Sequence, residues 1–360
     1  MSAAAPPLSI RSRLHDYTVR FHAGLEFVGE LSRVPNALFV VDANVARLHA
    51  KPLAAFSREQ TLTLEATEEN KTFEGATRVY EALLDRAAKK NATIVSLGGG
   101  IVQDVTGFAA STLYRGVKWI FVPTTLLAQA DSCIGAKTSL NFRRYKNLLG
   151  TFYPPHEIHL SPAFLDTLTR DDFFSGLGEV VKLHLMGGDA RVAELTAALP
   201  ALRAREPDAT LRAIRTSLDV KLSWIEGDEL DAGKRNLLNY GHDLGHALES
   251  TSEFKVPHGQ AVVAGMLFAN SLARRRGVLS PALEERLRPL LLGTLVTRPT
   301  RAHLETPRIV DAMGKDKKRT GKGLAVILLR DGLALEKIDD ATPDEVGAAI
   351  GDLVTNLELT

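Results

Sequence analysis

Three of the chain's ten histidines fall within one short stretch, and their spacing suits metal chemistry. His242 and His246 stand four residues apart in a segment with helical character, so both rings would lie on one face. His258 follows a break at Pro257. Two or three such imidazoles, with a carboxylate from another segment, are typical ligands of a zinc-type ion. A histidine-rich helix that hydrogen-bonds only to its own core is the alternative.

A carboxylate for such a site stands in an apolar segment, Gly178-Glu179-Val180-Val181-Lys182. Glu179 and Lys182 would share one helical face, often as a surface ion pair. The apolar neighbours instead predict a partly buried pair, and a buried glutamate needs a partner or a metal. A polar stripe at about one-turn spacing is also expected to face a cleft, with Lys221 beside it; it consists of Arg235, Asn239, His242 and His246.

A glycine-rich turn could bind phosphate groups. Residues 93–97 read as a buried strand that runs into Gly98-Gly99-Gly100 and then a helix of small residues. Glycines let backbone N–H groups approach a pyrophosphate, and a helix start favours negative charge. The pattern is not GxGxxG, so a tight structural turn is the alternative. Asp42 and Asn44 follow another predicted strand and either face a ligand or cap a helix.

Cationic and amide side chains gather near this turn in the sequence. Arg115, Lys137, Lys146 and Asn147 would hold phosphate or carboxylate oxygens, unless they lie on a solvated loop. The chain as a whole has a net charge of +1, which argues against nucleic acid or an anionic membrane as partner. A small anionic substrate fits better.

Bulk properties indicate a soluble, cytoplasmic protein of two domains. A chain of 360 residues exceeds one usual core, and its 45% hydrophobic content can bury two. The single cysteine, Cys133, fits a reducing compartment. No apolar run approaches the roughly 20 residues of a membrane span, and the N-terminus does not resemble a signal peptide.

The order of expected elements divides the chain at about residue 165. Residues 1–165 alternate strands (37–41, 62–66, 93–97, 119–122) with helices such as 71–90, which predicts an α/β domain with a parallel sheet. Residues 166–360 carry helical patterns and predict an all-α domain. Residues 324–329 could form a strand or a buried helical turn.

Seven motifs together resemble the dehydroquinate synthase family of sugar phosphate cyclases over about residues 42–329. They are SLGGGIVQDVTGFAASTLYRGV, VPTTLLAQADSCIGAKTSLN, YKNLLGTFY, GLGEVVK, RNLLNYGHDLGH, PHG and DKK. The resemblance implies an NAD-binding α/β domain, a helical metal- and substrate-binding domain, an active site between them and a homodimer. It also implies a zinc or cobalt ion held by Glu179, His242 and His258.

The same resemblance implies roles for further residues. The NAD contacts would be Asp42, Asn44, Glu68, Lys71, Gly99, Gly100, Asp104, Thr124, Thr125, Asp131, Lys137, Lys146, Thr167 and Leu168. The substrate phosphate would meet Lys137, Asn147, Asn239, His246 and Lys317, with Arg115 from a neighbouring subunit. This places His246 with the phosphate and not with the metal. Lys221 and Arg235 would grip the substrate carboxylate, and Asp131, Lys146 and Lys182 would complete the pocket.

The implied reaction converts 3-deoxy-D-arabino-heptulosonate 7-phosphate to 3-dehydroquinate and phosphate, with NAD reduced and then reoxidised. Several positions depart from the common family pattern: Ala136, Phe142 to Tyr145, and Asp243-Leu244. Ala136 and Phe142 keep open a sister cyclase acting on sedoheptulose 7-phosphate, whereas the intact Lys221, Arg235 and Asn239 favour the carboxylated substrate. A metal-dependent polyol dehydrogenase and an inactive NAD-binding regulator are the remaining alternatives.

Overall fold

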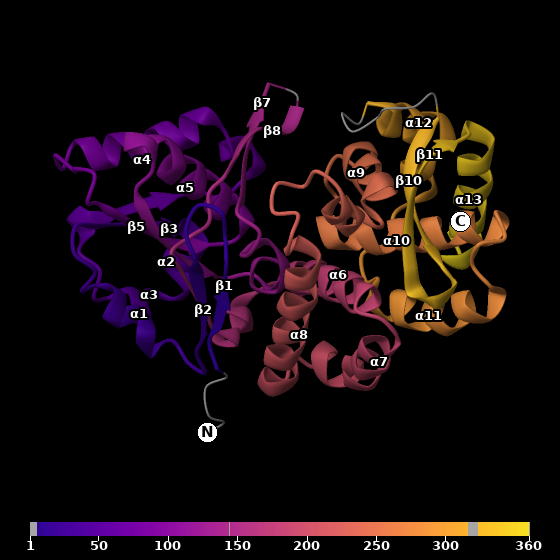
Figure 1. Ribbon diagram of the computed structural model, residues 1–360, viewed down its shortest axis with the longest axis horizontal. Coiled ribbons are helices and arrows are strands. Elements are labelled where there is room, and N and C mark those ends of the chain that lie inside the picture. The colour runs from indigo at the N-terminus through magenta and orange to yellow at the C-terminus, as the bar shows by residue number, and fades with distance from the viewer. Residues whose placement is uncertain (1–5, 144, 316–322, 360) are drawn as a thin grey trace. The chain divides into compact units, whose positions relative to one another are not determined.

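The computed structural model describes residues 6–143, 145–315 and 323–359. The chain forms two compact units (Figure 1). Unit 1 contains the residues up to Leu168 together with Ile225–Leu230, and unit 2 contains Thr169–Trp224 and the residues from Asp231 onward. Each unit is described separately below. Lys317, predicted to contact phosphate, lies outside the described residues.

Unit 1 is built on a seven-stranded sheet with the order β1-β2-β9-β6-β5-β3-β4. All neighbouring strands are parallel except β1 and β2, which pair antiparallel. The strands are β1 (Leu8–Ile10), β2 (Tyr17–Phe21), β3 (Ala37–Asp42), β4 (Thr61–Leu64), β5 (Thr93–Gly98), β6 (Lys118–Pro123) and β9 (Glu157–Leu160). The parallel α/β architecture predicted from the sequence is therefore confirmed.

Helices cover this sheet because its central strands are apolar on both faces. Every residue of β3 and β5 is buried, as is usual for a parallel sheet between helical layers. Phe39 and Val41 of β3 belong to one apolar core with Phe27 and Val45 from helices α1 and α2. The helices of unit 1 are α1 (Glu26–Leu31), α2 (Ala43–Leu48), α3 (Ala50–Leu53), α4 (Phe73–Leu84) and α5 (Gly100–Thr112).

Helix α4 is shorter than the helix predicted at residues 71–90. Thr72 caps its start by accepting a hydrogen bond from the Gly75 backbone N–H at 3.3 Å. The helix ends at Leu84, and Ala87 has a positive φ of 51° that no helix continues through. Short 3-10 helices lie at Arg58–Gln60, Glu68–Asn70, Leu113–Arg115 and Pro162–Thr167, and a π-helical turn, η4, at Ala128–Ser132.

A separate antiparallel hairpin lies beside α5 in unit 1. It consists of β7 (Lys137–Phe142) and β8 (Tyr145–Phe152). The sequence predicted no strands here and left a solvated loop as one alternative, because the charged and amide side chains hide the strand alternation. Thr138 and Thr151 face each other across the hairpin, with their hydroxyl oxygens 2.7 Å apart.

Unit 2 is helical with one small sheet. Its helices are α6 (Arg170–Met186), α7 (Asp189–Arg203), α8 (Pro207–Ile225, whose last residue belongs to unit 1), α9 (His242–Thr251), α10 (His258–Arg275), α11 (Pro281–Thr294), α12 (Thr306–Gly314) and α13 (Pro343–Asn356). The antiparallel pair β10 (Leu324–Arg330) and β11 (Ala334–Ala341) extends the predicted all-α domain by two strands, so residues 324–329 are a strand.

Helix α10 is the central element of unit 2. Its residues from Gly259 to Ala273 are all buried, and it packs against α6, α9, α11, α13 and β10. Short 3-10 segments lie at Lys234–Asn239 (η6), Arg301–Leu304 (η7) and Asp331–Leu333 (η8). None of the helices in the described part of the chain is long and apolar enough to cross a membrane.

Candidate active site

Glu179, His242 and His258 converge within unit 2. One ligating atom from each lies within 4.8 Å of those of the other two. The Nε2 atoms of His258 and His242 lie 3.3 Å and 3.5 Å from Oε1 of Glu179. Glu179 is on α6, and the two histidines are the first residues of α10 and α9. Three segments far apart in the sequence thus supply one carboxylate and two imidazoles, a donor set that suits a zinc-type ion.

Two glycines let α6 approach α10 at this point. A Cβ on Gly259 would lie only 1.7 Å from the Ser175 backbone oxygen, and one on Gly178 would lie 2.3 Å from the Gly259 oxygen. The Gly259 N–H also donates to the Ser175 hydroxyl at 3.0 Å. Gly178 directly precedes Glu179, and Gly259 directly follows His258. This backbone contact therefore sets the distance between Glu179 and His258.

A second close approach joins α9 to α10. Gly241 precedes His242 with a φ of 80°, a left-handed conformation that favours glycine. A Cβ on Gly265 would lie 1.9 Å from the Gly241 oxygen. The neighbouring Tyr240 is fully buried, and its hydroxyl donates to Oδ1 of Asn270 on α10 at 2.5 Å. The start of α9, and with it His242, is therefore fixed against α10.

The Glu179 carboxylate is buried with its charge only partly compensated. Lys182 Nζ lies 2.5 Å from Oε2, so the predicted pair is fully buried. Among the described residues, no hydrogen-bond donor is well aligned with Oε1. Burial would raise the pKa of Glu179, yet Lys182 and His258 hold that pKa below its usual range. An anionic oxygen between two imidazole nitrogens fits a divalent cation.

The two imidazoles respond to this environment in opposite ways. Burial opposes a charge on His258, but the carboxylates of Glu249 and Glu179 raise its pKa to about 10. Burial and the nearby Lys182 lower the pKa of His242 well below its usual value. The carboxylates around His258 therefore favour a positive charge there. A metal ion would supply that charge in place of the second imidazole proton.

His246 lies on the exposed side of α9, next to the same histidines. Its ligating atom groups with those of Glu249 and His258, again within 4.8 Å, but not with Glu179. The i,i+4 spacing of the two α9 histidines therefore does not put both on Glu179. Glu249 was absent from the sequence prediction, although it follows His242 by seven residues and so shares its helical face.

The other predicted substrate residues of unit 2 lie on three elements. Lys221 on α8 and Arg235 on η6 are both buried. Asn239 ends η6 and donates from Nδ2 to the Asn236 oxygen at 2.8 Å. The continuous helical stripe predicted here is interrupted, because Gly241 separates η6 from α9. Asp243, a departure from the family pattern, accepts a hydrogen bond from the Ile327 N–H of β10 at 2.8 Å.

In unit 1, three neighbouring strands end in predicted nucleotide-binding residues. Asp42 ends β3, and Thr124 and Thr125 follow β6. Gly98 ends β5, and Gly99 leads directly into Gly100, the first residue of α5. Parallel strands place these ends at one edge of the sheet. The Thr124 N–H donates to the Gly98 oxygen at 3.0 Å. Asp42 also caps α2, with the Asn44 N–H donating to Oδ1 at 2.8 Å, as the capping alternative predicted.

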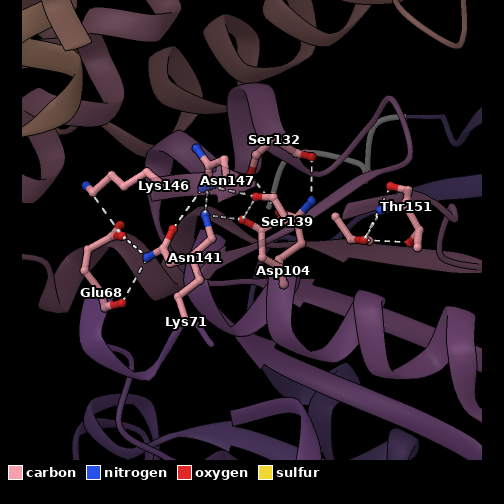
Figure 2. Close-up of polar contacts among 11 residues, drawn as sticks. Glu68, Lys71, Asp104, Ser132, Ser139, Asn141, Lys146, Asn147 and Thr151 are labelled. Atoms are coloured by element: carbon pink, nitrogen blue, oxygen red, sulfur yellow. Dashed lines mark hydrogen bonds and ion pairs between the residues drawn. The ribbon is translucent and has the colours of Figure 1, made fainter. Parts of the chain in front are cut away.

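The β7–β8 hairpin ties several further predicted residues into one polar network (Figure 2). Lys71 Nζ lies 2.6 Å from Oδ2 of Asp104 on α5 and donates to Oδ1 of Asn147 at 2.7 Å. Ser139 donates to Asp104 through its N–H and its hydroxyl, at 2.9 and 3.0 Å. Asp104 thus accepts three donors and joins the helix to the hairpin.

Glu68 and Lys146 form the outer part of the network (Figure 2). Their charged atoms lie 3.5 Å apart, and Asn141 donates to Oε2 of Glu68 at 2.9 Å. Asn141 also accepts from the Asn147 N–H at 3.0 Å. Lys71, predicted to contact NAD, and Lys146, predicted to hold an anionic group, are therefore already neutralised in part by Asp104 and Glu68.

The remaining predicted residues of unit 1 are spread over several elements. Thr167 shares a hydrogen bond with His49 Nε2 at 2.8 Å, and Leu168 follows directly. Asp131 lies in η4 and Lys137 begins β7. Arg115 ends the 3-10 turn before β6 with a φ of 63°.

Comparison with known proteins places the whole arrangement in a family. Residues 61–175 match the family described as 3-dehydroquinate synthase N-terminal, and residues 176–319 match 3-dehydroquinate synthase C-terminal. The 3-dehydroquinate synthase of Halorhodospira halophila is 40% identical over 297 residues, covering 82% of this chain and 83% of that protein.

Solved structures agree with this placement. The 2-epi-5-epi-valiolone synthase of Streptomyces hygroscopicus, solved with NAD+ and Zn2+ bound, superimposes with a TM-score of 0.81 at 27% identity, covering 94% of this chain and 97% of that one. A probable glycerol dehydrogenase of Sinorhizobium meliloti shares the fold alone, with a TM-score of 0.64 at 15% identity over 94% of this chain and 97% of that one.

An α/β unit with a glycine turn and a helical unit with a Glu-His-His group define a protein of the sugar phosphate cyclase class. Within that class, the chain belongs to the 3-dehydroquinate synthase family. Its activity is that of this family, a carbon–oxygen lyase reaction.

Proposed function

We propose that this chain converts 3-deoxy-D-arabino-heptulosonate 7-phosphate to 3-dehydroquinate and phosphate, using NAD as a recycled redox cofactor and one divalent ion, zinc or cobalt. The observation that carries the proposal is the group of Glu179, His242 and His258, whose donor atoms converge within 4.8 Å. The names of its curated relatives support the same reaction.

Unit 1 would bind NAD at the edge where β3, β5 and β6 end. Gly99 precedes and Gly100 begins the 13-residue helix α5, whose first N–H groups suit the pyrophosphate. Asp42, Asn44, Glu68 and Lys71 would contact the remainder of the nucleotide, together with Asp104, Thr124, Thr125, Asp131, Lys137, Lys146, Thr167 and Leu168. Bound NAD would accept a hydride from a substrate carbinol and later return it.

Unit 2 would hold the metal ion and the substrate carboxylate. A divalent ion on Glu179, His242 and His258 would polarise a substrate hydroxyl oxygen. Arg235 presents a planar fork of donors that matches a carboxylate, and Lys221 adds a second cation. Both side chains are buried, where a charge-assisted hydrogen bond is stronger than in water. Lys182 keeps Glu179 ionised and so able to bind a cation.

The side chains proposed for the substrate phosphate are hydrogen-bond donors, with Arg115 supplied by a second copy of the chain. The set is Lys137, Asn147, Asn239 and His246, with Lys317 expected to join it. This set lacks a carboxylate, so the proton removed next to the new ketone would pass to the leaving phosphate. These residues would then act by orientation and charge rather than as a general base.

Sedoheptulose 7-phosphate is the second candidate substrate, favoured by the likeness to a valiolone synthase and by Ala136 and Phe142. The backbone conformation at position 136 does not explain the alanine found there. Its φ of 63° is left-handed, which the more common glycine adopts without strain. Ala136 therefore adds backbone strain at this position. The carboxylated substrate remains preferred, because Lys221, Arg235 and Asn239 are intact.

A side-by-side assay tests the proposal. Phosphate release is measured with NAD and either zinc or cobalt on 3-deoxy-D-arabino-heptulosonate 7-phosphate, sedoheptulose 7-phosphate and glucose 6-phosphate. We expect turnover of the first, with 3-dehydroquinate as the product. Turnover of sedoheptulose 7-phosphate alone would contradict the proposed substrate while leaving the reaction class intact.

A further inference from the structure

The two histidines of the metal group have different partners on their second ring nitrogens. Nδ1 of His242 lies 3.3 Å from the backbone oxygen of Tyr240. Nδ1 of His258 lies 3.1 Å from Oε2 of Glu249, a carboxylate. Both rings therefore direct Nε2 toward Glu179. Among the described residues, the Nδ1 partner of His258 is a charged side chain and that of His242 is a backbone carbonyl.

The partner of Nδ1 decides which nitrogen can bind a metal. A neutral imidazole carries one proton, and an acceptor at Nδ1 keeps it there, leaving the lone pair of Nε2 free for the ion. A carboxylate acceptor also makes the ring a stronger ligand and fixes its orientation. The His258 side chain is 32% exposed, whereas that of His242 is 11% exposed. Packing therefore restrains His258 less, so its orientation depends more on the hydrogen bond to Glu249.

Resting on the proposed metal-dependent function, we propose that Glu249 is a positioning residue for the metal centre. It accepts the Nδ1 proton of His258, which presents Nε2 to an ion shared with Glu179 and His242. Glu249 does not touch the ion or the substrate and acts only through His258.

The position of Glu249 is set by how α9 and α10 meet. Glu249 lies near the end of α9 and His258 begins α10, so their hydrogen bond closes the connection between the two helices. The Glu249 side chain is only 14% exposed. Within the same connection, the Val256 N–H donates to the Ser252 hydroxyl at 3.4 Å. Partial burial and the hydrogen bond to His258 restrict the Glu249 carboxylate, so it loses little entropy when it orients the ring.

The alternative role of Glu249 is to bind a second metal ion together with His246 and His258. Donor atoms of His246, Glu249 and His258 also lie within 4.8 Å of one another. The two uses exclude each other, because Nδ1 of His258 cannot hold a proton for Glu249 and also bind a metal. Our proposal predicts one ion per chain, whereas the competing use predicts two.

Three variants and a matched control test this role. Glu249→Ala removes the acceptor, Glu249→Gln removes the charge at nearly constant shape, and Glu249→Asp keeps the charge on a shorter side chain. Glu253→Gln removes an exposed carboxylate from the connection between α9 and α10, where it pairs with Lys255. For each full-length protein, the dissociation constants of Zn2+ and Co2+ are measured by chelator competition, together with the bound metal content and the Co2+ absorption spectrum.

We expect Glu249→Gln and Glu249→Ala to weaken binding of the single ion by about 10- to 100-fold and to shift the Co2+ spectrum. Glu249→Asp should recover part of the affinity, and Glu253→Gln should match the unchanged protein. Equal dissociation constants in all four variants would overturn the proposal, as would two ions in the unchanged protein and one in Glu249→Gln. If Glu249→Ala does not fold, the Gln and Asp variants decide alone. Tight binding of one ion without dehydroquinate formation would refute the proposed function but not the role of Glu249.

Discussion

Replacing Gly259 with alanine tests how helix packing builds the metal group. The new Cβ would lie 1.7 Å from the Ser175 backbone oxygen and 2.6 Å from its carbonyl carbon. Ordinary contact requires a separation greater by roughly 1.5 Å, and the obstacle is backbone that cannot rotate away. Helices α6 and α10 must therefore move apart, or α10 must start later.

Both changes carry an energetic cost and displace His258 from Glu179. Overpacking of a core costs about 1–3 kcal/mol, and we expect the upper end here, about 3 kcal/mol, because backbone is displaced. The hydrogen bond from the Gly259 N–H to Ser175 would be lost as well. Metal affinity should fall by about 10-fold or more, as when the support of a ligand is removed.

The assay compares unfolding in denaturant and chelator competition for Zn2+ in two matched variants. Gly351 of α13 is also helical, but nothing lies within 4 Å of the position a Cβ would take. Gly351→Ala should gain up to about 1 kcal/mol from helix propensity and leave metal binding unchanged. If Gly259→Ala matched Gly351→Ala in both measurements, the packing argument for this site would be refuted.

Three further predictions follow from the site and from unit 1. His258→Ala should abolish metal retention and turnover, and an unchanged metal content would show that His258 is not a ligand. Arg235→Ala should raise KM for the carboxylated substrate by about 10- to 100-fold, the size of a lost charge-assisted contact, with exposed Arg191→Ala as the control; an equal loss on sedoheptulose 7-phosphate would argue against the carboxylate role. Burial and the neighbouring His22 lower the pKa of His159 from 6.5 to about 4. Between these two pH values the unfolded chain binds more protons than the folded chain, so the free energy of unfolding decreases as the pH is lowered. That loss amounts to about 2 kcal/mol between roughly pH 8 and pH 5, and His159→Asn should reduce it in denaturant unfolding at the two pH values; the same loss in the variant would contradict the assignment.

The buried strands of unit 1 could be predicted because their local pattern agrees with their final environment. The apolar runs at residues 37–41, 93–97 and 119–122 all became central parallel strands. Strands β1, β2 and β9 lie toward one edge of the sheet and were missed, since they are short or carry charged and polar residues. The hairpin β7–β8 was missed because its polar side chains form a network with Asp104 of α5 and with Glu68 and Lys71, which precede α4.

The metal group was predictable only in part. The histidine spacing indicated His242 and His246, with His258 as a third candidate, and the family resemblance then assigned His246 to the phosphate. The apolar neighbours of Glu179 indicated a buried carboxylate in need of a partner or a metal. The contacts that assemble them depend on Gly178 against Gly259, which are 81 positions apart in the chain and carry no local signal. Glu249 could have been found from helical periodicity, but its partner on the next helix depends on tertiary packing.

The balance between phosphate release and NADH accumulation tests the central claim most directly. The protein is incubated with a divalent ion, excess 3-deoxy-D-arabino-heptulosonate 7-phosphate and one equivalent of NAD, and both products are followed together. Recycling of the hydride within one site predicts many phosphates per NAD with no net NADH. NADH that rises in step with product, or product that stops at one per NAD, would contradict the account.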